Sequence, residues 1–440
     1  MTDQTPTPSP GRRARRVGTS VAGARAARRG GAAEGGSGVA AGSGGRRKRP
    51  QPGRVVAKVI TATLLSLAIV TGVGVVLIYN NWNGNIDHQD LSSLLRNRPA
   101  KKKSGPLNIL VMGSDSRSGK GDNIDHKGNI GARSDTTILF HLSANRKFAY
   151  GISIPRDTLV NRPACYTKSG TKIPAEKQQM WNAAFAVGGP ACTIEQFEQL
   201  SGIRVDNYIV VDFNGFKTMV DALDGVQVCI PQEIDDPAHH IKLMPGTREI
   251  KGAQALSYVR VRYTVGNGMD TGRIKRQQAF MSAMINKADS AGMLARPDRL
   301  VGFINALTGS LQTDFKNVGQ MASIAEAARG VGMSDIKFVT TPWELAPSDP
   351  NRLQWLPSVH KLFKLARDDK PLTKQFLDES ISANQSPNGS PSKTAAASGG
   401  PSGSASPSGK ASKGGSQGGG GSQSGGLSNA ERAASGLCTS

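Results

Sequence analysis

The feature that most constrains this chain is a run of 21 residues without a charge, from Val59 to Tyr79. At a helical rise of about 1.5 Å per residue, such a run can cross a hydrocarbon core of roughly 30 Å. Six Lys or Arg residues lie between Arg46 and Lys58, directly before the run, and Trp82 follows it. A basic flank marks the cytoplasmic side of a membrane helix, and aromatic residues mark an interface. The pattern predicts a single-pass cell-membrane protein with its N-terminus in the cytoplasm and everything after Tyr79 outside.

Two alternatives to a membrane anchor are a cleaved signal peptide and the core helix of a soluble domain. The run is too long for a typical signal segment, and no A-x-A cleavage site follows it. A core helix would not need the basic flank.

Composition divides the rest of the chain. We expect a disordered basic cytoplasmic arm over 1–54, the transmembrane helix over 55–79, a polar stalk over 80–105, one extracytoplasmic domain over 106–381 and a Gly/Ser/Pro-rich disordered tail over 382–440. The net charge is +22, and the arm alone carries twelve Lys or Arg against two Asp or Glu. Because membrane topology explains such an arm, the charge does not indicate a nucleic-acid partner.

The chain has four cysteines, and none of them forms a CxxC pair, which argues against a zinc site. An exported domain permits disulfides. We therefore expect one disulfide among Cys165, Cys192 and Cys229, in a pairing that the sequence leaves open, with buried free thiols as the alternative.

Strands and helices alternate within the domain, which predicts an α/β architecture. Strands are expected over 107–113, 136–142, 148–154, 208–213, 226–230 and 336–340, with residues 143–147 as a hairpin turn. Helices are expected from a capping box at Thr193 and Gln196, and over 217–223, 273–288 and 321–329. Residues 252–262 also have a helical pattern, but Arg260 and Arg262, two apart, would share a face only on a strand. For this reason we expect 258–262 not to be helical.

Charged residues gather at the ends of the first three expected strands. The set, with later residues of the same kinds, is Asp115, Arg117, Arg133, Asp135, Arg156, Asp157, Arg260, Arg262, Asp270, Arg273, Arg276 and Gln277. Strand ends at one edge of an α/β sheet commonly build the ligand site. Arginine suits bidentate recognition of phosphate oxygens, and aspartate suits magnesium that also binds phosphate. The set is what a metal-held pyrophosphate needs, although each single Arg–Asp pair could be a structural salt bridge.

Six segments in order resemble the LytR-CpsA-Psr family: NILVMGSDSR, ARSDTTILF, SIPRDTLV, WNAAFAVGG, VDFNGFKTMVDALDGV and YVRVRY…DTGRIKRQQ. They span about residues 106–290, and the Gly/Ala/Arg-rich ends resemble the actinobacterial type. The resemblance implies a three-layer α/β/α domain with a mixed central sheet. It also implies a magnesium-dependent (or manganese-dependent) enzyme that moves a glycopolymer, such as teichoic acid or arabinogalactan, from a polyprenyl-pyrophosphate carrier to peptidoglycan.

Residue roles also follow from the resemblance. Asp115 and Asp135 match metal-binding aspartates. Arg133, Arg156, Arg260, Arg262, Arg273 and Gln277 match the pyrophosphate-contacting set, which we extend to Arg117, Asp270 and Arg276. Asp135, Arg156 and Asp157 are the candidate catalytic residues, with Asp135 or Asp157 as proton acceptor.

Other interpretations stay open. An apolar groove for the prenyl chain is expected near Phe213, Phe216, Phe280 and Met284, which could equally be core residues. With water in place of the sugar hydroxyl, the same site would make a polyprenyl-pyrophosphate-glycan pyrophosphatase. A membrane-bound regulator without enzymatic activity is the third possibility.

Overall fold

The computed structural model describes residues 52–101, 105–114, 134–167, 169–237, 241–261, 265–266, 269–290, 296–387 and 426–439. The chain up to Leu67 forms one unit, of which only the start of helix α1 (Pro52–Asn85) is described. Its stretch Val56–Asn85 is long and apolar enough to cross a membrane, and its large apolar side chains, such as Leu64 and Leu65, are exposed. This is the surface that a lipid-facing helix presents.

A mixed eight-stranded sheet is the centre of the second unit, which begins at Ala68. Its order is β1 (Asp87–His88), β14 (Leu311–Thr313), β9 (Asn207–Asp212), β2 (Leu107–Ser114), β3 (Ser134–Leu142), β4 (Ala149–Ile154), β15 (Ile336–Thr340) and β18 (Ile381–Ser382). The pairs β1–β14, β9–β2 and β4–β15 are parallel, and the others are antiparallel.

The middle strands follow from their apolar alternation. Side chains of β2 alternate between half-buried and buried along the strand, with Leu110 and Met112 fully buried. Strands β3 and β4 form the predicted hairpin, with Leu142 opposite Ala149. As a result, the carboxyl ends of β2 and β4 and the start of β3 lie at one edge of the sheet, with Gly113 opposite Thr136 and Thr137 opposite Ile154.

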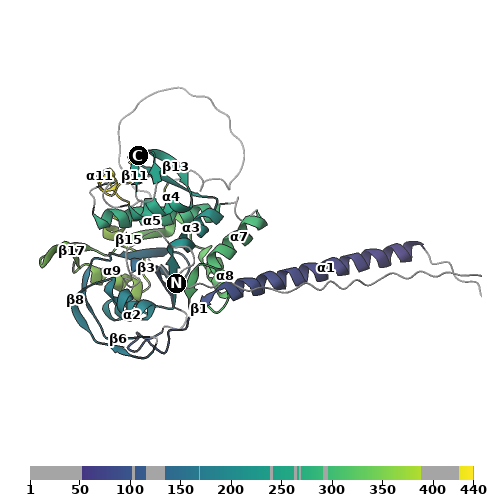
Figure 1. The fold of residues 1–440 in the computed structure, drawn as a ribbon, viewed down its shortest axis with the longest axis horizontal. Coiled ribbons are helices and arrows are strands. Elements are labelled where there is room, and N and C mark those ends of the chain that lie inside the picture. The colour runs from purple at the N-terminus through teal and green to yellow at the C-terminus, as the bar shows by residue number, and fades with distance from the viewer. Residues whose placement is uncertain are drawn as a thin grey trace, which may run out of the picture. The chain divides into compact units, whose positions relative to one another are not determined.

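Helices cover both faces of the sheet (Figure 1). On one face, α2 (Ala183–Ser201), α9 (Val359–Arg367) and α10 (Lys374–Asp378) share a core with β2, β3 and β4. On the other lie α3 (Phe213–Ala222), α4 (Gly252–Arg260) and α5 (Asp270–Asp289), and α5 packs against β15 and β18. The predicted three-layer α/β/α domain is thereby confirmed.

Short elements complete the described structure. They are five two-stranded sheets and four short helices: α7 (Pro297–Thr308), α8 (Val318–Ala328), the 3-10 helix η2 (Met333–Asp335) and α11 (Asn429–Ala434). These sheets pair β5 (Leu159–Arg162) with β8 (Glu176–Met180), β6 (Cys165–Tyr166) with β7 (Lys172–Ile173), β10 (Val226–Ile230) with β13 (Gly246–Ile250), β11 (Ile234–Asp236) with β12 (Ile241–Leu243), and β16 (Trp343–Ala346) with β17 (Asp349–Trp355).

Two local predictions were wrong. The helix expected to begin at Thr193 begins ten residues earlier and is kinked at Gly188 and Gly189, whose backbone angles are not helical, just before Pro190. The Thr193 hydroxyl donates to the Gly189 carbonyl at 3.1 Å, inside the helix, and does not cap a helix end. Residues 258–260 are helical, contrary to the prediction, because α4 extends to Arg260 and is capped by Val261. Arg262 lies outside the described residues.

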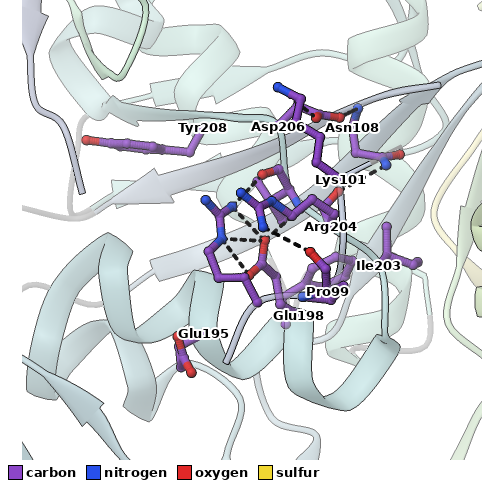
Figure 2. A network of polar contacts seen from close by, with 12 residues as sticks. Pro99, Lys101, Asn108, Glu195, Glu198, Ile203, Arg204, Asp206 and Tyr208 are labelled. Carbon is purple, nitrogen blue, oxygen red and sulfur yellow. Dashed lines mark hydrogen bonds and ion pairs between the residues drawn. The ribbon is translucent and has the colours of Figure 1, made fainter. Parts of the chain in front are cut away.

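The second half of the predicted stalk is fixed to the domain (Figure 2). The Arg98 guanidinium donates to both carboxylate oxygens of Glu198, at 2.7 to 3.2 Å, and to the Val205 carbonyl at 2.6 Å. Arg204 donates to the Pro99 carbonyl at 2.9 Å, and Lys101 lies 3.9 Å from Asp206. Because Glu198 is buried and accepts several charge-assisted hydrogen bonds, this contact is stronger than an exposed ion pair.

The cysteine prediction needs correction. Both Cys165–Cys192 and Cys229–Cys438 are disulfide-bonded, so one bond was foreseen within the first three cysteines and the second was missed. The second bond joins the domain to the end of the predicted tail. Residues 382–387 and 426–439 are folded, so a tail disordered from 382 onward is also wrong for these two segments.

Candidate functional site

Arg156 is the centre of a charged cluster at the edge where β3 begins and β4 ends. Its guanidinium is paired with Asp135 at the start of β3, and its Nε lies 3.8 Å from Asp157 and 3.7 Å from Asp270, the first residue of α5. Burial alone lowers the pKa of Arg156, but the carboxylates of Asp135, Asp270 and Asp157 outweigh burial and raise it. The predicted residues from three separate motifs are thus brought together around one permanent positive charge.

Helix α5 adds a second arginine to this cluster. Arg273 lies one turn after Asp270, and its Nη2 is 2.8 Å from an Asp270 oxygen and donates to the Asp135 carbonyl at 3.4 Å. Both Arg273 and Asp270 are buried. A guanidinium fixed in this way loses little freedom when an anion binds, which is the basis of a preorganised site.

Gln277 lies one turn further along α5 and connects the site to α4. Its side-chain oxygen accepts a hydrogen bond from the Thr136 hydroxyl at 3.2 Å, and its Nε2 donates to the Val259 carbonyl at the same distance. Thr136 was not singled out from the sequence, although it lies in the ARSDTTILF segment.

Arg276 points to different partners from Arg273. Its two terminal nitrogens donate to the carbonyls of Val261 and Ser435, the latter at 2.9 Å, and burial lowers its pKa to about 10. Among the contacts of the described residues, its role is to hold backbone, so its pyrophosphate contact stays a prediction.

Arg260 ends α4 and lies over the ring of Phe213, with 4.7 Å between guanidinium carbon and ring centroid. Phe280 is fully buried in the adjoining core, whereas Phe213, Phe216 and Met284 are partly buried against it. Phe280 is therefore a core residue, and the Phe213 ring contacts both this core and the Arg260 guanidinium.

Sequence reasoning missed Arg352 on β17, whose Nη1 is 3.9 Å from Asp157. It lies in the segment DPNRLQW, far in sequence from any charged motif. The contact of β17 with Thr158 and β5 brings Arg352 near Asp157. Four predicted residues, Asp115, Arg117, Arg133 and Arg262, lie outside the described residues.

Of the two predicted magnesium ligands, Asp135 lies within the described part of the chain. Asp135 supplies carboxylate oxygens, the ligand type that magnesium prefers, and it lies beside the arginines that would share a phosphate. In the described part of the chain no group of three or more His, Cys, Asp or Glu side chains is arranged to hold a metal. The second predicted ligand, Asp115, lies beyond that part.

Arginines and aspartates gather at one edge of the central sheet of an α/β/α domain, the place where proteins of the α/β class commonly bind their ligands. Residues 78–366 match the LytR_cpsA_psr family, which is more than half of the chain. The protein belongs to the LytR-CpsA-Psr family.

Two curated relatives show how far the likeness extends. The probable cell wall biosynthesis protein LcpB of Corynebacterium glutamicum is 32% identical over 303 residues, covering 66% of this chain and 67% of LcpB. The polyisoprenyl-teichoic acid–peptidoglycan teichoic acid transferase TagV of Bacillus subtilis is 32% identical over 257 residues, covering 56% of this chain and 61% of TagV. The chain therefore spans about three fifths of TagV. The crystal structure of TagV is similar with a TM-score of 0.46 and 26% identity, over 61% of this chain and 98% of that one.

Proposed function

We propose that this protein transfers a phosphate-linked glycopolymer from a polyprenyl-pyrophosphate carrier to peptidoglycan, forming a phosphodiester in cell-wall assembly. The observation that carries the proposal is Arg156, which lies against the carboxylates of Asp135, Asp157 and Asp270 beside the buried Arg273. Family membership and the names of LcpB and TagV support the same chemistry.

In the proposed reaction, a sugar hydroxyl of peptidoglycan, the primary hydroxyl of N-acetylmuramic acid, attacks the glycan-side phosphorus. The new oxygen–phosphorus bond forms as the bond to the bridging oxygen breaks, and polyprenyl phosphate leaves with the electron pair. Arg156, Arg273 and Arg260 bind phosphate oxygens and neutralise charge as it moves to the leaving group. Arg352 is close enough to Asp157 to orient that carboxylate.

The hydroxyl proton needs an acceptor within hydrogen-bond reach. Asp135 and Asp157 are the candidates, because both carboxylates lie beside Arg156.

Magnesium, or manganese, belongs to the proposal through Asp115 and Asp135. Bound there, it would supply positive charge to the pyrophosphate. The apolar surface of Phe213 and Met284 would receive the first part of the prenyl chain, directly beside Arg260.

The proposed topology places α1 across the cell membrane, with the N-terminus in the cytoplasm and the domain outside. The basic flank before Val59 supports this orientation, and a lipid carrier in the same membrane would then deliver its pyrophosphate to the domain's side.

The test is product analysis of the full chain in lipid nanodiscs, with a short-chain polyprenyl-pyrophosphate disaccharide as donor. Peptidoglycan strands are either supplied or omitted. Release of polyprenyl phosphate only with strands, together with label on the strands, supports the transferase. Release of polyprenyl phosphate without strands shows a pyrophosphatase instead. If the chain neither releases polyprenyl phosphate nor binds the donor, the regulator is favoured. Arg329→Ala removes an arginine from an exposed ion pair with Glu326 and should keep full activity. It is the control for the loss of Arg156.

A further inference from the structure

The C-terminal segment 426–439, here called the C-terminal hook, is folded onto the domain. Its helix α11 starts at a capping box formed by Ser428 and Glu431, Leu437 is buried in a cluster with Phe338 and Ile381, and Cys438 is bonded to Cys229. These contacts hold a segment that is separated by 209 residues from its disulfide partner.

The hook fits closely against the connection between α4 and α5. Gly266 has φ +69°, and a Cβ there would be 2.5 Å from the Ala434 carbonyl oxygen. Gly436 has φ +68°, and a Cβ there would be 2.3 Å from a Val265 methyl carbon. Both positions therefore require glycine, for conformation and for the close approach of the two backbones.

Arg276 joins the hook to the end of α4. One terminal nitrogen donates to the Ser435 carbonyl in the hook and the other to the Val261 carbonyl, directly after Arg260. The last carbonyls of a helix lack hydrogen-bond donors within the helix, and the Arg276 side chain supplies a donor to one of these carbonyls. Arg276 lies on α5, the helix that begins at Asp270, three residues after Arg273.

We propose that the C-terminal hook and Arg276 together position the ends of α4 and α5, and through them Arg260 and Asp270, for pyrophosphate binding. Arg276 is in this proposal a positioning residue that acts through the hook. The inference rests on the proposed function for its ligand, but the contacts on which it depends do not.

The experiment compares the full chain with Cys229→Ser/Cys438→Ser and with a chain truncated after Pro387. The control is Cys165→Ser/Cys192→Ser, which also removes one disulfide but leaves the hook in place. Binding of inorganic pyrophosphate with magnesium is measured by calorimetry, exchange of the Val265 and Gly266 amides by mass spectrometry, and the melting temperature by circular dichroism.

We expect the hook variants to weaken pyrophosphate binding about tenfold, the size expected for lost preorganisation. We also expect faster exchange at Val265 and Gly266. The control should lower the melting temperature while leaving both other readouts unchanged. Hook variants with a lowered melting temperature but wild-type exchange and wild-type pyrophosphate binding would overturn the proposal.

A double-mutant cycle with Arg276→Gln separates positioning from direct contact with the ligand. If Arg276 acts through the hook, adding Arg276→Gln to the Cys229→Ser/Cys438→Ser chain weakens binding no further. Fully additive losses would show that Arg276 contacts pyrophosphate itself and would overturn the positioning role. If the wild-type chain binds no pyrophosphate, the proposed function fails, and amide exchange alone still decides whether the hook orders the connection.

Discussion

At the scale of single residues, Arg156 has two tasks that the sequence could not separate. It faces Asp135, Asp157 and Asp270, and together with Arg273 and Arg352 it compensates the charge of these carboxylates. The same guanidinium is the proposed phosphate ligand. Its place at the end of a strand could be read from the IPRD segment, but the carboxylate from α5 comes from 114 residues further along, where no local pattern links the two.

Substitutions at Arg156 should divide these tasks. Arg156→Ala removes the compensating charge and a phosphate contact, so we expect a lower melting temperature and a transfer rate reduced about a hundredfold, or ~3 kcal/mol. Arg156→Lys keeps the charge but not the planar two-oxygen contact, so we expect a melting temperature near wild type and still reduced transfer. Full transfer by both folded variants would contradict the phosphate role.

Gly151 shows a residue-scale constraint that comes from packing. It lies on β4 opposite Phe338 of β15, and a Cβ there would be 2.6 Å from a Phe338 ring carbon. Gly151→Ala should therefore destabilise the domain by about 1–3 kcal/mol, measured by denaturant unfolding.

A matched glycine should respond in the opposite direction. Gly302 is an exposed residue within α7, and a Cβ there would meet nothing within 4 Å. Gly302→Ala should stabilise by about 0.5–1 kcal/mol, because glycine loses more freedom in a helix than alanine. Equal effects at the two positions would mean that Phe338 moves aside.

At the scale of elements, periodic segments could be predicted and irregular ones could not. The β3–β4 hairpin and the strands at 107–113 and 336–340 follow from short apolar runs bounded by turn residues. The start of α2 was predicted too late because Thr193 and Gln196 have the pattern of a capping box, whereas the helix begins at Ala183 and continues beyond a kink at Gly188 and Gly189. Arg260 and Arg262 suggested a strand, yet α4 extends to Arg260, so the spacing of two charges was a weaker guide than the apolar pattern of the helix.

Helix α11 was missed for a different reason. Its surroundings are Gly- and Ser-rich, which indicates a linker by composition, and the capping-box pattern from Ser428 to Glu431 was the one local signal of a helix. Burial of Leu437 and the bond to Cys229 depend on a contact across most of the domain sequence, which local patterns do not contain.

At the scale of the whole molecule, the two disulfides make a direct prediction. All four cysteines are bonded, so alkylation of the unreduced, denatured chain should label none of them, and reduction should expose four. Mass spectrometry of the intact chain checks this count. Two labelled thiols in material isolated from the membrane would show that one of the two disulfides is not formed in the cell.

Topology is the second prediction at this scale. With the N-terminus in the cytoplasm, alkaline phosphatase fused after Ser440 should be active, because that enzyme folds only outside the cytoplasm, and a reporter restricted to the cytoplasm should be inactive at the same site. The reverse pattern would exclude access to carrier and peptidoglycan on the outer side.

In the proposed topology, the fixed stalk would also limit how far the domain can work from the bilayer. Extended, residues 80–105 would reach up to about 90 Å. Instead, the Asn83 side chain already accepts a hydrogen bond from the Val318 amide, at 2.9 Å, and Asp87–His88 joins the sheet. In the proposed topology Tyr79 lies at the outer interface, and the four residues of helix from Tyr79 to Asn83 would span about 6 Å. If the proposed function and topology hold, a transferase held this close to the membrane would meet glycan strands as they leave it, and polymer would be attached to new wall before that wall moves outward.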